Sequence, residues 1–100
     1  MMKTKVAKVN EIKEGQPKSI TINGKEIAIF KINSQLFAID NQCLHMGGPL
    51  SEGLLENDNI TCPLHGWQFD VKSGKCIMPG SGKLNNYKVI VDKDEIFIEI

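Results

Sequence analysis

The sequence contains no arginine, and twelve lysines balance twelve acidic residues, so the formal net charge is zero. It therefore lacks the basic stripe that follows a phosphate backbone, which argues against nucleic acid as a partner. No apolar run is long enough to span a bilayer, so a membrane is not an expected partner either. Residues 1–8 place lysines among their apolar residues and lack the pattern of a secretory signal. We therefore expect a cytoplasmic protein.

Cysteine and histidine are also scarce, with three and two copies respectively. Three cysteines cannot all pair with one another, and in a reducing compartment we expect them to bind metal or to pack. Each histidine closes a short motif with a cysteine, as C-x-H at Cys43 and His45 and as C-x2-H at Cys62 and His65. Cys76 lies outside both motifs, and we expect it to be a small buried hydrophobe.

The outer parts of the chain predict antiparallel strands. Residues 19–22 alternate apolar with polar, and the Asn23-Gly24 pair that follows favours the type I′ turn of a hairpin. Strands are expected at residues 19–22, 25–32, 36–39, 87–91 and 96–100, with a tight turn at 33–35 and a solvated, charged turn at 92–95. One hundred residues form one domain. The prediction is an all-β, small antiparallel β-sandwich or barrel whose base comprises about residues 1–40 and 83–100.

The composition changes between these strands, from about residue 41 to residue 82, to short pieces rich in Gly, Pro, Cys and His. Within this stretch, only residues 59–61 and 67–71 have the pattern of strands. The one helical feature expected is a brief turn within residues 50–55. We interpret the stretch as an insertion of two loops that carries the function.

The two motifs together read C-x-H-x16-C-x2-H. Two thiolates and two imidazoles could form a tetrahedral zinc site, or they could replace half of an all-cysteine iron–sulfur set, so the ligand types leave the metal open. Their spacing says more. Structural zinc modules usually bring cysteines in pairs and histidines in pairs, whereas each loop here supplies one of each. Mixed pairs suit a two-metal centre.

The motif sequences Cys43-Leu44-His45-Met46-Gly47-Gly48 and Cys62-Pro63-Leu64-His65-Gly66-Trp67 closely resemble those of the Rieske proteins. That resemblance implies a small β-domain with a cluster-binding insertion and one [2Fe–2S] cluster per chain. It implies that Cys43 and Cys62 bind one iron and that His45 and His65 bind the other. It also implies that residues 78–82 form a proline-bearing third loop over the cluster.

The neighbours of the ligands indicate which kind of Rieske centre to expect. High-potential members carry a further cysteine in each motif, joined as a disulfide, and by resemblance these positions are Gly48 and Leu64. They also place Ser and Tyr hydroxyls after the second histidine, where this chain has Trp67 and Phe69. Hydrogen bonds to sulfur favour the reduced state, so their loss predicts a potential near about −150 mV rather than about +300 mV.

Glycine and apolar residues beside the ligands have expected roles too. Small residues such as Gly48 and Gly66 would let the backbone approach the inorganic sulfurs. We interpret Trp67 and Phe69 mainly as core side chains. An apolar collar around the cluster, formed by Leu44, Met46, Pro49, Leu64 and Met78, would either fill the space between the loops or receive a redox partner.

By resemblance, the leading hypothesis is a monomeric electron carrier, similar to the ferredoxins of ring-hydroxylating dioxygenases. It would pass one electron from a flavin-dependent reductase to a terminal oxygenase or other acceptor. It is not expected to be an enzyme, since both histidines are committed to the cluster and no nucleotide-binding glycine fingerprint is present. Two alternatives remain: a small subunit of a larger reductase such as nitrite reductase, and a structural zinc or interaction module.

Overall fold

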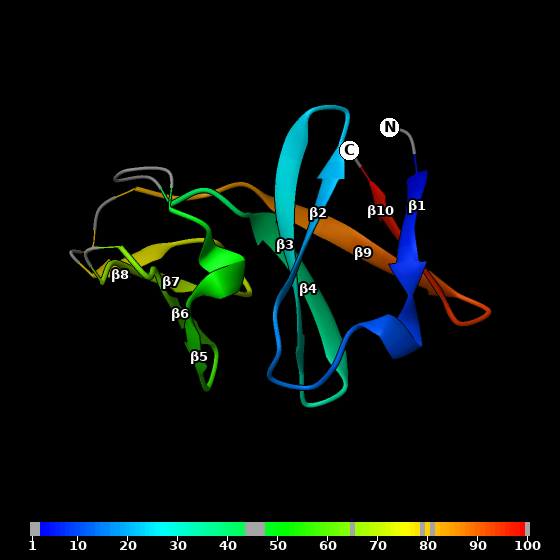
Figure 1. Ribbon diagram of the computed structural model, residues 1–100, viewed down its shortest axis with the longest axis horizontal. Helices are drawn as coiled ribbons and strands as arrows, with labels where there is room; N and C mark the ends of the chain where they lie inside the picture. Colours follow the sequence, from blue (N-terminus) through cyan, green and yellow to red (C-terminus); the bar gives the residue numbers. More distant parts are fainter. Residues whose placement is uncertain (1–2, 44–47, 65, 79, 81, 100) are drawn as a thin grey trace.

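A computed structural model describes residues 3–43, 48–64, 66–78, 80 and 82–99 (Figure 1). Over these residues the chain forms strands and two short 3-10 helices, η1 (Val9–Glu11) and η2 (Leu50–Glu52). The strands are β1 (Lys3–Lys8), β2 (Lys18–Ile22), β3 (Lys25–Ile32), β4 (Gln35–Asp40), β5 (Leu54–Glu56), β6 (Asn59–Thr61), β7 (Gln68–Asp70), β8 (Cys76–Met78), β9 (Asn86–Asp92) and β10 (Glu95–Glu99). The all-β prediction is confirmed.

Six strands form one antiparallel sheet in the order β1-β10-β9-β4-β3-β2. Its ends approach each other where β1 lies near β2, so the sheet is a nearly closed barrel (Figure 1). The predicted turn after β2 is confirmed, because Asn23 has φ +49° and Gly24 has φ +81°. The β3–β4 turn is built in the same way by Asn33 at φ +50° and Ser34 at φ +66°.

The remaining strands form a smaller sheet in the order β5-β6-β7-β8, which lies beside the barrel (Figure 1). The predicted strands at 59–61 and 67–71 appear as β6 and β7, but β5 and β8 were not predicted. The helical turn expected within residues 50–55 is confined to η2, since Leu54 already pairs with Thr61. Gly53 permits this because a Cβ there would overlap the carbonyl oxygen of Thr61.

Strand β3 is buried on both faces and joins the two parts. Ile27 and Ile29 pack into the barrel core, whereas Ala28 and Phe30 belong to a second core shared with the smaller sheet. Successive side chains of a strand point to opposite faces, so an uninterrupted apolar run serves two cores at once. Fully burying a side chain such as Phe30 contributes about 1.5–3 kcal/mol. The smaller sheet is therefore attached to the barrel through the apolar side chains of β3 that pack in the second core.

Polar contacts join the strand that leaves the barrel to the strand that returns. The N–H of Asp40 donates to the carbonyl oxygen of Asn85 at 3.0 Å, and the N–H of Asn85 donates to Asp40 Oδ2 at 3.0 Å. The hydroxyl of Tyr87 donates to Asp40 Oδ1 at 2.5 Å. Burial, together with the Asp40 carboxylate, raises the pKa of Tyr87 to about 12. None of the described segments is a helix long and apolar enough to cross a membrane.

Candidate cluster-binding site

The first candidate loop follows β4 and is closed by three successive pairings. The carbonyl oxygen of Asn41 accepts the N–H of Leu50 at 2.7 Å, Gln42 forms an antiparallel bridge with Pro49, and the N–H of Cys43 donates to the carbonyl oxygen of Gly48 at 2.9 Å. These pairings make a short two-stranded neck. The backbone of Cys43 is therefore held by a hydrogen bond at the point where the first candidate loop begins.

The second candidate loop connects β6 to β7 and is closed in the same way. The N–H of Cys62 donates to the carbonyl oxygen of Trp67 at 2.7 Å. Each loop thus begins with a cysteine whose N–H binds the carbonyl of the residue five positions later. Gly66 has φ +73° and its N–H donates to the carbonyl oxygen of Leu64 at 2.8 Å, so glycine suits the turn before Trp67.

The structure brings the two cysteine side chains together. Cys43 and Cys62 are each 3% exposed, and their thiols lie within hydrogen-bonding reach of each other. Burial raises the pKa of the Cys62 thiol, and the Cys43 side chain raises it further, while a hydrogen bond from the Leu64 backbone opposes the rise. The metal-free thiol of Cys62 is therefore protonated at neutral pH, and metal binding must release that proton.

Gly48 lies directly against the second loop. A Cβ at Gly48 would stand 2.8 Å from Cys62 Sγ and 3.0 Å from both Cγ and Cδ1 of Leu64. The two positions identified by resemblance as those of a disulfide, Gly48 and Leu64, therefore do face each other across the loops. Here they form a close backbone-to-leucine contact, with no disulfide at this site.

The described residues supply two of the four predicted ligands. His45 and His65 lie outside the described residues, as do Leu44, Met46 and Gly47, and the described part of the chain contains no cluster of three metal-ligating side chains. The fit to a metal centre rests on the thiols: two soft donors, buried and adjacent, on loops that also carry the only histidines of the sequence. This donor set fits a Rieske cluster.

Strand β8 pairs with β7, the strand that follows the second cysteine loop. The N–H of Cys76 donates to the carbonyl oxygen of Gly82 at 3.0 Å, which closes the predicted third loop, although Pro79 and Ser81 lie outside the described residues. Cys76 is 7% exposed within the apolar core, so its predicted packing role is confirmed.

Apolar side chains are exposed around these loops. Leu64 is 44% exposed and Met78 is 57% exposed, as predicted for an apolar collar, and Pro49 is half-buried. Ile77, 45% exposed, was missed by the sequence reasoning, because no pattern marked β8 as a strand. The donation from the Leu64 backbone to Cys62 was also missed, since sequence carries no signal for a backbone hydrogen bond to sulfur.

The aromatic residues after the second loop have the predicted packing role. Phe69 is fully buried, and Trp67 is partly buried against the same core. Both side chains lack a hydroxyl, so neither can supply the O–H donor that high-potential centres are expected to place here. The interpretation of Trp67 and Phe69 as core side chains is confirmed.

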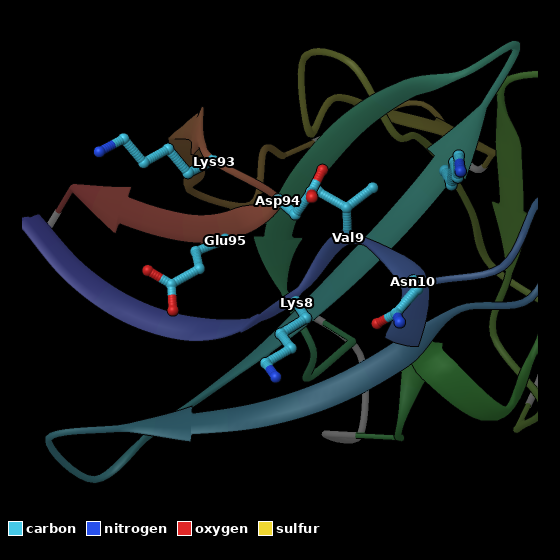
Figure 2. A pocket seen from close by; sticks show the side chains of 7 residues that line it. Lys8, Val9, Asn10, Lys93, Asp94 and Glu95 are labelled. Atoms are coloured by element: carbon cyan, nitrogen blue, oxygen red, sulfur yellow. The ribbon is translucent and has the colours of Figure 1, made fainter.

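A separate cavity of about 680 Å³ opens on the barrel between β1, β3 and the β9–β10 turn. The residues that line this cavity include Lys8, Lys93 and Asp94. Figure 2 shows that the side chain of Lys93 extends away from Asp94. Charges of both signs line it without converging on one point, and no thiol contributes to it. This cavity has no visible part in the chemistry of the cysteine loops.

The family of the chain follows from the comparison with known proteins. The model of the Rieske [2Fe–2S] domain matches residues 2–88, and the chain belongs to this family. The cofactor of this family is a [2Fe–2S] cluster. Within the family, the chain is of the ferredoxin type, which carries electrons. The chain is 34% identical over 91 residues, covering 90% of itself and 88% of the relative, to the ferredoxin component of a naphthalene 1,2-dioxygenase system from Pseudomonas aeruginosa.

Solved structures give the same result. The ferredoxin of carbazole 1,9a-dioxygenase from Nocardioides aromaticivorans IC177 matches with a TM-score of 0.91 and 30% identity, covering 98% of this chain and 97% of that one. A complex of reduced oxygenase and oxidized ferredoxin in carbazole 1,9a-dioxygenase matches with a TM-score of 0.89 and 28% identity, covering 96% and 91%. Both support the ferredoxin kind.

The nitrite reductase alternative is weaker. A solved structure named as a small subunit of an NADPH nitrite reductase matches with a TM-score of 0.89 and covers both chains fully, but at 21% identity. At that identity the match shows a shared fold alone.

Proposed function

We propose that this chain is the ferredoxin component of a ring-hydroxylating dioxygenase system. It would carry one electron from a flavin-dependent reductase to a terminal oxygenase. The observation that carries the proposal is the pair of buried, adjacent thiols of Cys43 and Cys62 on two equivalently closed loops. The ferredoxin components among its relatives support the choice of partners.

Cys43, His45, Cys62 and His65 are the proposed ligands of one [2Fe–2S] cluster per chain. When bound, the cluster supplies a centre that gains and loses a single electron. The chain itself excludes water from the thiols and holds the two loops at a fixed separation. The backbone N–H of Leu64 donates to Cys62 Sγ, which stabilises negative charge on that sulfur.

A low midpoint potential is part of the proposal. The site lacks hydroxyl donors at Trp67 and Phe69, so fewer hydrogen bonds stabilise the reduced, more negative state. A value near about −150 mV is expected, and a midpoint well above zero would contradict this reasoning. The potential should fall further at alkaline pH, because an imidazole bound to oxidised iron loses its remaining proton more readily.

The proposal extends to organisation and location. We propose one domain with a base of about residues 1–40 and 83–100 and a cluster-binding part of about 41–82, acting as a monomer in the cytoplasm. The two cores separated by β3 support the division into parts.

The test uses cluster-loaded protein mixed under anaerobic conditions with a flavoprotein reductase, NADH and a terminal oxygenase encoded beside its gene. The expected result is fast bleaching of the cluster by the reductase, followed by reoxidation that depends on the oxygenase. Copurification with one fixed large reductase subunit would instead favour the subunit alternative. A colourless protein with one zinc and no acid-labile sulfide would contradict electron transfer altogether.

A further inference from the structure

Asn41 is the one buried side chain among the described residues that is polar, with 2% of its surface exposed. It follows Asp40, the last residue of β4, and is the first residue of the neck. Taking an amide out of water is unfavourable unless its polar atoms find hydrogen-bond partners. A buried amide at this place therefore calls for an explanation in terms of what it binds.

Asn41 connects three segments through hydrogen bonds. Its N–H donates to the carbonyl oxygen of Glu26, at the start of β3, at 3.0 Å. Its carbonyl oxygen accepts the N–H of Leu50 at 2.7 Å, and its side-chain Oδ1 accepts the N–H of Ser51 at 2.8 Å. Asn41 thus connects the segment before the first loop to the segment after it, at Leu50 and Ser51, and to the barrel at Glu26.

The side-chain bond has a specific consequence. Ser51 belongs to η2, whose first N–H groups lack partners within so short a helix. Asn41 Oδ1 supplies one of those partners and so fixes η2 against the neck. Because Cys43 lies two residues after Asn41 and Gly48 two before Leu50, the positions of Cys43 and Gly48 depend on this attachment.

We propose that Asn41 is a positioning residue for the cluster: its side chain sets the place of the first loop, and hence the environment of Cys43 and the midpoint potential. Gly48 meets the second loop at close range, so a small shift of the first loop changes the contact with Cys62. Cluster potential responds to the hydrogen bonds that reach the sulfurs. This inference rests on the proposed ligation by Cys43.

The test compares three variants of the full chain loaded with cluster. Asn41→Leu keeps the size of the side chain but removes the acceptor, whereas Asn41→Asp keeps an acceptor oxygen. Val71→Ala is the control, because Val71 is fully buried in the core that contains Cys43, while its backbone N–H donates to the carbonyl oxygen of Asp58 and not to a residue of the neck. Readouts are the melting temperature, the rate of cluster loss to a chelator, the midpoint potential and the electron paramagnetic resonance (EPR) spectrum of the reduced protein.

Asn41→Leu should lose its cluster several-fold faster, with a more negative midpoint and an altered EPR line shape. Asn41→Asp should restore the wild-type line shape, and Val71→Ala should lower the melting temperature while leaving midpoint and line shape unchanged. A merely structural role for Asn41 predicts that Asn41→Leu matches Val71→Ala in all four readouts, and that result would overturn the proposal.

Hydrogen exchange on the wild-type protein keeps the proposal testable if Asn41→Leu does not fold. The amides of Leu50 and Ser51 should be protected together and exchange slowly, at similar rates. Exchange of the Ser51 amide at the rate of an exposed peptide would refute the attachment. A wild-type protein that binds no cluster would instead refute the proposed ligand set, so the two failures are distinguishable.

Discussion

Replacing Gly48 by alanine should disrupt the contact between the two cysteine loops. The added Cβ would lie 2.8 Å from Cys62 Sγ, whereas ordinary van der Waals contact begins at 3.4 Å. The exposed end of Leu64 can rotate away, but Cys62 Sγ is buried and, as a proposed ligand, would be held by iron in the loaded protein. The backbones of the two loops must therefore separate by several tenths of an ångström.

Overpacking of this kind costs about 1–3 kcal/mol. Because each 1.4 kcal/mol is about a factor of ten, we expect cluster affinity to fall by about one to two powers of ten. The assay is iron and acid-labile sulfide per chain after reconstitution, followed by the rate at which a chelator bleaches the visible absorbance. Gly48→Ala should bind less iron and bleach faster than the wild type.

Two further variants identify the cause. Gly24→Ala is the control for adding a Cβ, since no atom lies within 4 Å of the Cβ of Gly24, and any effect of its positive φ is local to the β2–β3 turn. It should destabilise the β2–β3 turn and leave the bleaching rate unchanged. Combining Gly48→Ala with Leu64→Ala relieves only the leucine contact, so it should not restore the cluster. Wild-type iron content and bleaching in Gly48→Ala would refute the reasoning.

The remaining predictions concern residues around the site. Tyr87 is the sole tyrosine, so the Cζ chemical shift of 13C-labelled tyrosine should titrate near pH 12, and Asp40→Asn should lower that pKa; titration near pH 10 in the folded wild type would contradict the contact. Because the pKa of Tyr87 is higher in the folded than in the unfolded chain, the protonated Tyr87 hydroxyl stabilises the fold below about pH 10. This stabilisation is lost as the pH rises through about 12. Cys76→Ala should keep full iron content with a stability loss of about 1 kcal/mol by chemical denaturation, and loss of iron would make Cys76 a ligand. Gly74→Ala should destabilise the metal-free protein strongly in the same assay, because φ is +83° and a Cβ would overlap the carbonyl oxygen of Leu84; a wild-type denaturation midpoint would count against that overlap.

The hairpins of the barrel could be predicted because their signals are local. Asn23-Gly24 tolerates the positive φ values of the turn, and the strand predicted at residues 25–32 has the bounds of β3. Strands β5 and β8 could not be predicted, since Leu54-Leu55-Glu56 and Cys76-Ile77-Met78 do not alternate apolar with polar residues, whereas Asn59-Ile60-Thr61 of β6 does. Their pairing is decided by neighbouring strands, which sequence pattern does not specify.

The site divides in the same way. The spacing of the cysteine and histidine motifs predicted that Cys43 and Cys62 lie in equivalent loops, and the structure brings these thiols together. The role of Gly48 was predicted as a close backbone approach, but the atoms that it meets became visible only in three dimensions. Asn41 was missed, because its partners Leu50 and Ser51 reach it only when the first loop closes.

The central claim is a cluster ligated by two cysteines and by the only two histidines of the chain. The most direct measurement is electron–nuclear double resonance of the dithionite-reduced protein, with and without 15N-labelled histidine. We predict strong couplings from two nitrogens, both changed by the label, in a protein that contains two irons and two acid-labile sulfides per chain. Spectra with no histidine nitrogen, or with only one, would contradict the assignment of His45 and His65.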